Sequence, residues 1–189
     1  MTIVSYFLDL LSSWGYLFIA PLKDFNMLWI IIPAYLNWIF TEFYQEKKGT
    51  SLGNAVSNGV VVLWIGIDFA RQLVSQLTLK SLSISGFFLK FFIALLFFGY
   101  GLAIIVEGIK GRALTRFIGR IREVTYAILV LTPMFYGVVA LNFKIIFATV
   151  LFFPIFYGVV ELIDRITPNP KTYEEEEEYE RKQKEKDRL

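Results

Sequence analysis

Long apolar stretches constrain this chain more than any other feature of its sequence. A helix needs ~20 mostly apolar residues to cross the ~30 Å hydrocarbon core of a bilayer. Five segments meet this requirement readily, at residues 26–44, 54–76, 83–106, 123–141 and 144–163. The 56% hydrophobic content also exceeds that of an average soluble domain. We therefore expect an all-α, polytopic helical membrane protein.

Residues 2–20 are a weaker sixth candidate. The polar residues of this segment share one side of a helical wheel: Thr2, Ser5, Asp9, Ser12 and Tyr16. That pattern fits a span whose polar side faces protein, and equally an amphipathic helix lying in the membrane interface. If residues 2–20 form a span, a hairpin at residues 21–24 places both ends of that span where the distribution of Lys and Arg requires them. We therefore predict six spans. Five spans plus an N-terminal amphipathic helix is the alternative.

The basic residues predict how the chain is oriented. Lys and Arg gather in the 45–53 and 107–122 loops, whereas the alternate loops hold few of them. Cytoplasmic loops are enriched in Lys and Arg, so both termini are predicted to be cytoplasmic, in the cell membrane. The chain then divides into a transmembrane bundle, residues 1–168, and a charged cytoplasmic tail, residues 169–189. The tail is expected to form a short, solvated helix.

The segment "NAVSNGVVVLWIGIDFARQLVSQ", residues 54–76, carries a polar stripe. Seven side chains fall within about 60° of Asn54 on a helical wheel. They are Asn54, Ser57, Asn58, Asp68, Gln72, Ser75 and Gln76. An unpaired amide or carboxylate in hydrocarbon costs several kcal/mol, so the stripe is predicted to face other helices or a wet cavity.

Asp68 is the deepest clear charge in this segment. Arg71 follows it at i+3, close enough to pair along the helix. Lys90 lies at similar depth in the next span and could pair with Asp68 across a helix contact. Three interpretations remain open: a paired structural Asp68, an Asp68 that titrates or binds a cation, and a Lys90 that snorkels independently.

A second polar group is predicted near the cytoplasmic ends of the second and third spans. Asn37 and Thr41 lie one turn apart, and Thr41 and Asn58 should have similar depth. Asn54 opens the same third span. Interhelical hydrogen bonding is one role for these residues; a vestibule lined by amides, with Glu42 at its rim, is the other.

The 107–122 loop, with its "KGRALTRFIGRIREV" sequence, has an amphipathic pattern. Arg112, Arg116 and Arg120 repeat at i+4, opposite an apolar face. A basic helical turn beside the cytoplasmic leaflet is typical of anionic-lipid binding, although such residues also enforce topology. The predicted lipid contacts are Lys110, Arg112, Arg116, Arg120 and Arg122.

Two segments near the end of the predicted bundle resemble each other: "PMFYGVVAL" at 133–141 and "PIFYGVVEL" at 154–162. A proline inside a helix removes a backbone hydrogen bond and kinks the helix, and a glycine lets a partner approach closely. The resulting hinge candidates are Pro33, Pro133, Gly137, Pro154 and Gly158. Simple packing is the alternative role.

The absence of certain residue types limits the chemistry. The chain has no Cys and no His, which removes thiol nucleophiles, disulfides and nearly all zinc sites. No phosphate-binding or hydrolase motif is present. We expect no enzyme activity, cofactor, metal or nucleic-acid partner.

Three functions fit the pattern. The first is a small channel or transporter subunit that uses the polar stripe. The second is a non-catalytic scaffold subunit of a membrane complex or homo-oligomer, in which the stripe is a seam between helices. The third is a lipid-binding membrane protein, built on the basic loop and anionic lipids.

Overall fold

The structure is a computed structural model that describes residues 2–45, 51–79 and 83–168. Within these ranges it is helical, with no strand. The elements are α1 (Ile3–Ile19), α2 (Leu28–Phe40), α3 (Leu52–Thr78), α4 (Ile84–Ile109), α5 (Thr115–Ile118), α6 (Ile121–Phe135) and α7 (Phe143–Ile166). Two short 3-10 turns, η1 (Ala20–Leu22) and η2 (Phe25–Met27), precede α2, and a π-helical turn, η3 (Thr41–Gln45), follows it. The predicted tail, residues 169–189, lies outside the described residues.

Side-chain caps set where the four longest helices begin. Thr2, Ser51, Ser83 and Asn142 each have an extended backbone and accept a hydrogen bond from a backbone N–H in the first turn. Such a cap satisfies a donor that the helix itself cannot pair. The polar residues between the apolar segments therefore fix the helix boundaries.

Four helices are long and apolar enough to cross a membrane. They are Ile3–Leu22, Leu52–Thr78, Ile84–Ile109 and Phe143–Ile166. The all-helical prediction is therefore confirmed, and four of the six predicted spans have a matching long apolar helix. The other two predicted segments, 26–44 and 123–141, correspond to α2 and α6, which have 13 and 15 residues.

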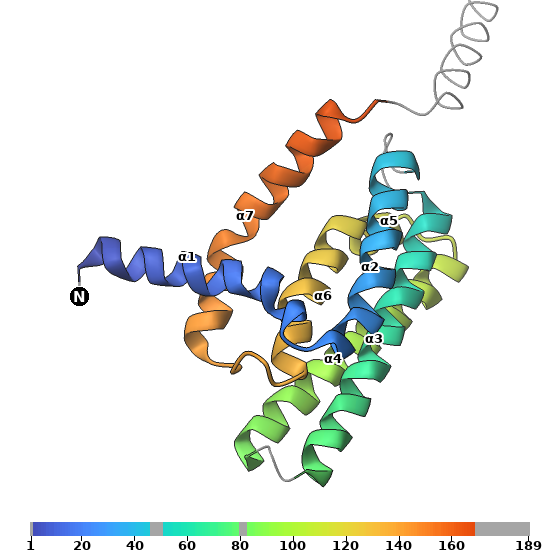
Figure 1. Cartoon of the computed structure of the whole chain (residues 1–189). Helices are drawn as coiled ribbons and strands as arrows, with labels where there is room; N and C mark the ends of the chain where they lie inside the picture. Colours follow the sequence, from blue (N-terminus) through green and yellow to red (C-terminus); the bar gives the residue numbers. More distant parts are fainter. Residues whose placement is uncertain (1, 46–50, 80–82, 169–189) are drawn as a thin grey trace, which may run out of the picture.

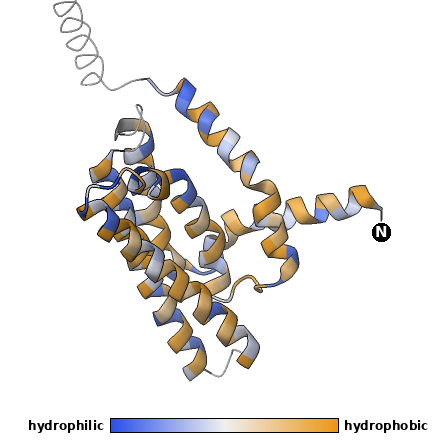
Figure 2. Ribbon diagram, turned by 180° about the vertical axis from the view of Figure 1, so that it is seen from behind, coloured by the Kyte–Doolittle hydropathy of each residue, from blue (hydrophilic) through white to orange (hydrophobic). Residues whose placement is uncertain are grey.

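The long helices α3 and α4 form a tight antiparallel hairpin (Figure 1). Glycines permit the close approach: a Cβ on Gly66 would lie 2.8 Å from the backbone nitrogen of Phe98, and one on Gly101 would lie 2.5 Å from that of Leu63. On the other side of the bundle α1 packs against α7, and its N-terminal end extends away from the remaining helices (Figure 1). We call α1 and α7 the two arms, and apolar residues cover much of the outside of both (Figure 2).

The short helix α6 is the interior helix of the bundle. Eleven of its 15 residues are buried. One apolar cluster joins α6 to α1, α2 and α7, and a second joins it to α2, α3 and α4. In the second cluster the rings of Phe69 and Phe135 stack with their centroids 3.8 Å apart. Two faces of α6 therefore pack against the two halves of the molecule.

The two similar segments adopt different conformations, and Pro133 lies in the last turn of α6 instead of in the middle of a span. Gly137 has a φ of +79°, and the Val138 N–H donates to the Pro133 carbonyl oxygen at 3.0 Å. This left-handed glycine cap ends α6. The chain therefore turns away at a point where we expected a longer helix. Pro154 and Gly158 instead lie inside the continuous α7.

The expected close approach at Gly158 is also wrong. A Cβ on Gly158 would meet no atom within 4 Å. Gly158 therefore faces open space and admits no neighbouring helix. Pro33 is exposed inside α2, a helix that continues into the π-helical turn η3.

Candidate functional site

Three residues form what we call the Asp68 cluster: Asp68, Arg71 and Tyr136. Arg71 Nη2 lies 2.6 Å from Asp68 Oδ1, and Arg71 Nε donates to the same oxygen at 2.8 Å. The Tyr136 hydroxyl donates to Asp68 Oδ2 at 3.0 Å. Both carboxylate oxygens thus have a donor, which offsets the cost of burying the charge. Tyr136 reaches Asp68 because Gly137 ends α6 at this level.

The local pair, Asp68 with Arg71, is the one that the structure contains. The alternative pair of Asp68 with Lys90 is wrong. Lys90 is buried, and its Nζ donates to Gln76 Oε1 at 2.7 Å. Gln76 lies two turns beyond Asp68 on α3, and its amide nitrogen donates to the Phe135 carbonyl oxygen. The stripe therefore supplies Lys90 with an amide partner instead of a carboxylate.

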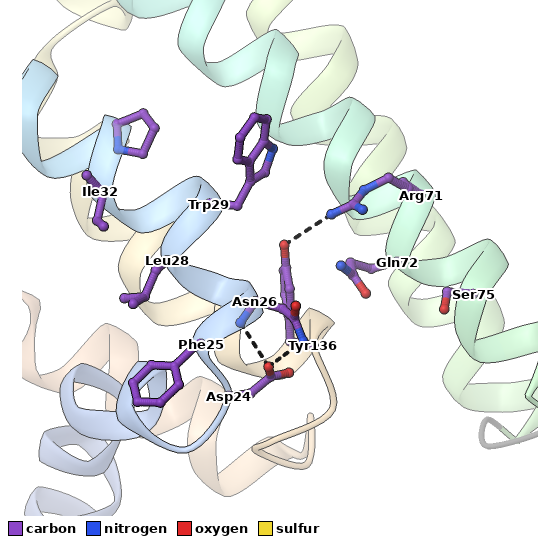
Figure 3. Close-up of a pocket in the computed structure, with 11 residues that line it drawn as sticks. Asp24, Phe25, Asn26, Leu28, Trp29, Ile32, Arg71, Gln72, Ser75 and Tyr136 are labelled. Carbon is purple, nitrogen blue, oxygen red and sulfur yellow. Dashed lines mark hydrogen bonds between the residues drawn. The ribbon is translucent and has the colours of Figure 1, made fainter.

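The two charges of the cluster differ in exposure. The Asp68 side chain is 3% exposed, whereas that of Arg71 is 61% exposed. Arg71 opens into a cavity of about 810 Å³ between α2, α3 and the end of α6 (Figure 3). This volume is within the range of small-molecule sites. The polar residues that line it are Asp24, Asn26, Arg71, Gln72, Ser75 and Tyr136.

A smaller cavity of about 290 Å³ lies beside the same residues. Its lining includes Asp68, Arg71 and Trp29, together with Trp64 and Ile67. Arg71 and Trp29 line both cavities. They therefore stand between the larger cavity and the space that Asp68 borders.

The predicted group of amides is partly assembled. Asn58 is fully buried, donates to the Gly119 carbonyl oxygen at 2.7 Å and accepts from Asn37 Nδ2 at 3.2 Å. Thr41 is buried at the start of η3. Asn54 is half-buried in the first turn of α3, where its backbone N–H bonds to the Ser51 cap. Asn37 and Asn58 thus join α2, α3 and the turn before α6.

A second charged group, the Arg122 cluster, surrounds Arg122 at the start of α6. Arg122 Nε donates to Glu42 Oε1 at 2.6 Å, and Nη1 donates to Glu161 Oε2 at 2.9 Å. Asp164 Oδ2 lies 3.8 Å from Nη2, and the guanidinium carbon lies 4.9 Å from the centre of the Tyr157 ring. The cluster consists of Glu42, Arg122, Tyr157, Glu161 and Asp164.

Two predictions fail at the Arg122 cluster. Arg122 was predicted to contact lipid, and one alternative placed Glu42 at the rim of a vestibule, yet their side chains are 13% and 5% exposed. The i+4 argument assumed one helix across the loop. In the structure α5 covers only Thr115–Ile118, and Gly119 separates it from α6. Arg122 is the second residue of α6 and faces carboxylates from η3 and α7.

The remaining loop cations stay on the surface. Lys110 and Arg112 both pair with Glu107, with nitrogen to oxygen distances of 3.5 and 2.6 Å. Arg116 is exposed, and Arg120 Nη2 donates to the Tyr157 hydroxyl at 2.9 Å. These four cations do not form one helical row, because Gly111, with a φ of +68°, and Gly119 interrupt the helix.

Comparison with other proteins gives no further assignment. No family model matches the chain, and no curated protein or solved structure is significantly similar to it. The site therefore has to be interpreted from its own chemistry.

Sequence reasoning missed four participants: Asp24, Tyr136, Tyr157 and Glu161. The sequence signal for the two tyrosines is the repeated Phe-Tyr-Gly, which places Tyr136 near Arg71 and Tyr157 near Arg122. Asp24 lies in the turn before α2, where it caps η2 by accepting the Asn26 N–H. Glu161 pairs with Arg165 at i+4 as well as with Arg122, so the local pair conceals the long-range one.

Proposed function

We propose that this chain is a multi-pass protein of the cell membrane with six spans and both termini in the cytoplasm. The four long apolar helices and the distribution of Lys and Arg support this arrangement. The two shorter spans are α2 continued by η3, and α6. The Asp68 end of α3 then lies toward the outside and the Arg122 cluster toward the cytoplasm.

We further propose that the chain is a small channel or transporter subunit, with Asp68 as an ion or proton site. The supporting observation is that a buried carboxylate borders one cavity while its partner Arg71 opens into another. Ionisable residues inside membrane segments are costly and usually mark ion or substrate pathways. Displacement of Arg71 would connect the two cavities and expose Asp68.

A scaffold role is the second candidate. It is favoured by the two apolar arms, in which Ile3 of α1 is 90% exposed and Phe143 of α7 is 82% exposed. In that case the arms contact a second copy of the chain or another membrane subunit, and the Asp68 cluster serves as an internal seam.

The surface cations of the 107–122 loop support a lipid contact in either case. Replacing Arg112, Arg116 and Arg120 together should weaken binding to vesicles that contain anionic lipid, since each basic residue near such a surface contributes roughly 1 kcal/mol. Unchanged binding would remove this contact from the proposal.

Flux through proteoliposomes tests the transport proposal. Asp68→Asn keeps the size of the side chain and removes its charge, so it should abolish proton or cation flux while the purified yield is maintained. Asp9→Asn is the matched control, because Asp9 pairs with Lys144 on the opposite arm, between α1 and α7. Full flux in Asp68→Asn would refute the ion-site role, and loss of folding with no flux in the wild type would favour the scaffold.

A further inference from the structure

We propose that the larger cavity binds a small zwitterion with an apolar body, such as an amino acid with a hydrophobic side chain. The biological role of this binding rests on the proposed function, whereas the binding itself is argued from the residues of the cavity. The lining supplies one fixed cation, one fixed anion and an apolar wall, each from a different part of the fold.

Arg71 is the anion-binding group. Its hydrogen bonds to Asp68 and Tyr136 use Nε and Nη2, which leaves Nη1 for a ligand. Asp68 and Tyr136 hold the guanidinium from behind, and 61% of the side chain remains exposed. A guanidinium fixed in this way binds a carboxylate without losing further side-chain freedom. Gln72 and Ser75 lie on the same side of α3 and add polar groups (Figure 3).

Asp24 is the cation-binding group. Its Oδ1 accepts two hydrogen bonds from Asn26, one from the backbone N–H at 3.0 Å and one from Nδ2 at 2.8 Å. Both bonds orient the carboxylate and both end on Oδ1, so Oδ2 is available for an ammonium group. Figure 3 shows Tyr136 between Arg71 and the Asp24–Asn26 pair. The two fixed charges are thus separate sites within one cavity.

One wall of the cavity, on the side of Asp24 away from Arg71, is apolar (Figure 3). Phe25, Leu28, Trp29 and Ile32 come from η2 and the first turns of α2. They exclude a purely polar solute from much of the surface and match a hydrocarbon or aromatic body. A single arginine is a poor match for a polyanion. Within the described residues no group of three or more acidic side chains could hold a metal ion, so a divalent cation is also a poor match.

Titration calorimetry with three probes of one carbon skeleton tests this inference on the full chain in detergent micelles. Leucine carries both charges, 4-methylpentanoate lacks the ammonium group, and 3-methylbutylamine lacks the carboxylate. Leucine should bind at least about tenfold more tightly than either analogue, since each loses one charged hydrogen bond. Equal affinity for leucine and one analogue, or no heat with leucine, overturns the proposal.

Two variants with matched controls assign the site. Asp24→Asn keeps a capping side chain for η2 and should bring the affinity for leucine down to that for 4-methylpentanoate, whereas Asp9→Asn should leave it unchanged. Ser75→Trp should fill the cavity and abolish binding, whereas Ser57→Trp, an exposed serine at the other end of α3, should not. Binding that survives Ser75→Trp places the ligand elsewhere and overturns the assignment.

The result is independent of the flux experiment. Leucine binding in a protein whose flux is unaffected by Asp68→Asn would refute the ion-site role and keep the zwitterion site. If Asp68→Asn loses flux but the wild-type protein does not bind leucine, the ion-site role is kept and the zwitterion site is refuted.

Discussion

The segments at 133–139 and 154–160 share the pattern Pro-x-Phe-Tyr-Gly-Val-Val, yet they serve two different charged groups. The first ends α6 and directs the Tyr136 hydroxyl to Asp68. The second continues through α7 and places the ring of Tyr157 against Arg122. Tyr136 and Arg122 lie at opposite ends of α6, roughly 20 Å apart at ~1.5 Å per residue.

The two groups differ in which charge is hidden. In the Arg122 cluster the arginine is 13% exposed and binds carboxylates from two helices. In the Asp68 cluster the carboxylate is hidden, and the arginine opens into a cavity. A largely covered arginine that joins η3, α6 and α7 stabilises the fold. An arginine that faces a cavity is available to a ligand, so similar local sequences support structure at one end and a candidate site at the other.

The largest effect is expected from Arg122→Met. This change leaves Glu42 buried without its cation, which should lower the free energy of unfolding in micelles by ~3–5 kcal/mol. Arg165→Met is the control, because Arg165 is 75% exposed and should have little effect. A stability loss no greater than that of the control would contradict the closed, structural character of the Arg122 cluster.

Removal of each tyrosine hydroxyl should lower the free energy of unfolding by different amounts at the two clusters. Tyr136→Phe leaves Asp68 Oδ2 without its donor and should cost ~1–3 kcal/mol of unfolding free energy. Tyr157→Phe keeps the ring against Arg122 and loses a hydrogen bond from Arg120, which is 44% exposed, so it should cost less than about 0.5 kcal/mol. Equal losses in denaturant titrations would show that the two tyrosines are equivalent.

The smallest effects should have opposite signs. Gly137→Ala forces a side chain into a left-handed conformation and should destabilise the protein by ~1 kcal/mol. Gly158→Ala adds a methyl group inside α7, where no atom lies within 4 Å, and should stabilise it by ~0.4–1 kcal/mol. Shifts of the same sign in thermal unfolding would mean that the two glycines have the same conformation.

Local patterns predicted much of the fold and part of the site. Helical periodicity located the apolar helices and the polar side of α3, and i+3 spacing included the Asp68–Arg71 pair among its alternatives. Depth along the hairpin grouped Asn37, Thr41 and Asn58 but matched Asn58 with Thr41, whereas in the structure Asn58 accepts a hydrogen bond from Asn37. Each of these inferences depends on spacing within one helix or on two helices joined by a short loop.

The remainder depended on where helices end and which distant elements meet. Gly137 ends α6 and thereby brings Tyr136 to Asp68, whereas the similar Gly158 does not end α7. Arg122 binds Glu42, 80 positions earlier in the chain, from the first turn of α6, which begins after Gly119 caps the end of α5. No periodicity within one segment contains this information.

Cysteine accessibility tests the central claim, that the Asp68 end opens to water and the Arg122 end is closed. The natural chain has no Cys, so single variants can be made directly. Gln72→Cys and Ser75→Cys line the larger cavity, whereas Thr41→Cys replaces a residue that is 5% exposed next to Glu42. A hydrophilic maleimide added to the purified protein in detergent micelles, where both ends meet water, should label the first two and leave Thr41→Cys unmodified. Labelling of Thr41→Cys with no reaction at Gln72→Cys and Ser75→Cys would contradict the account.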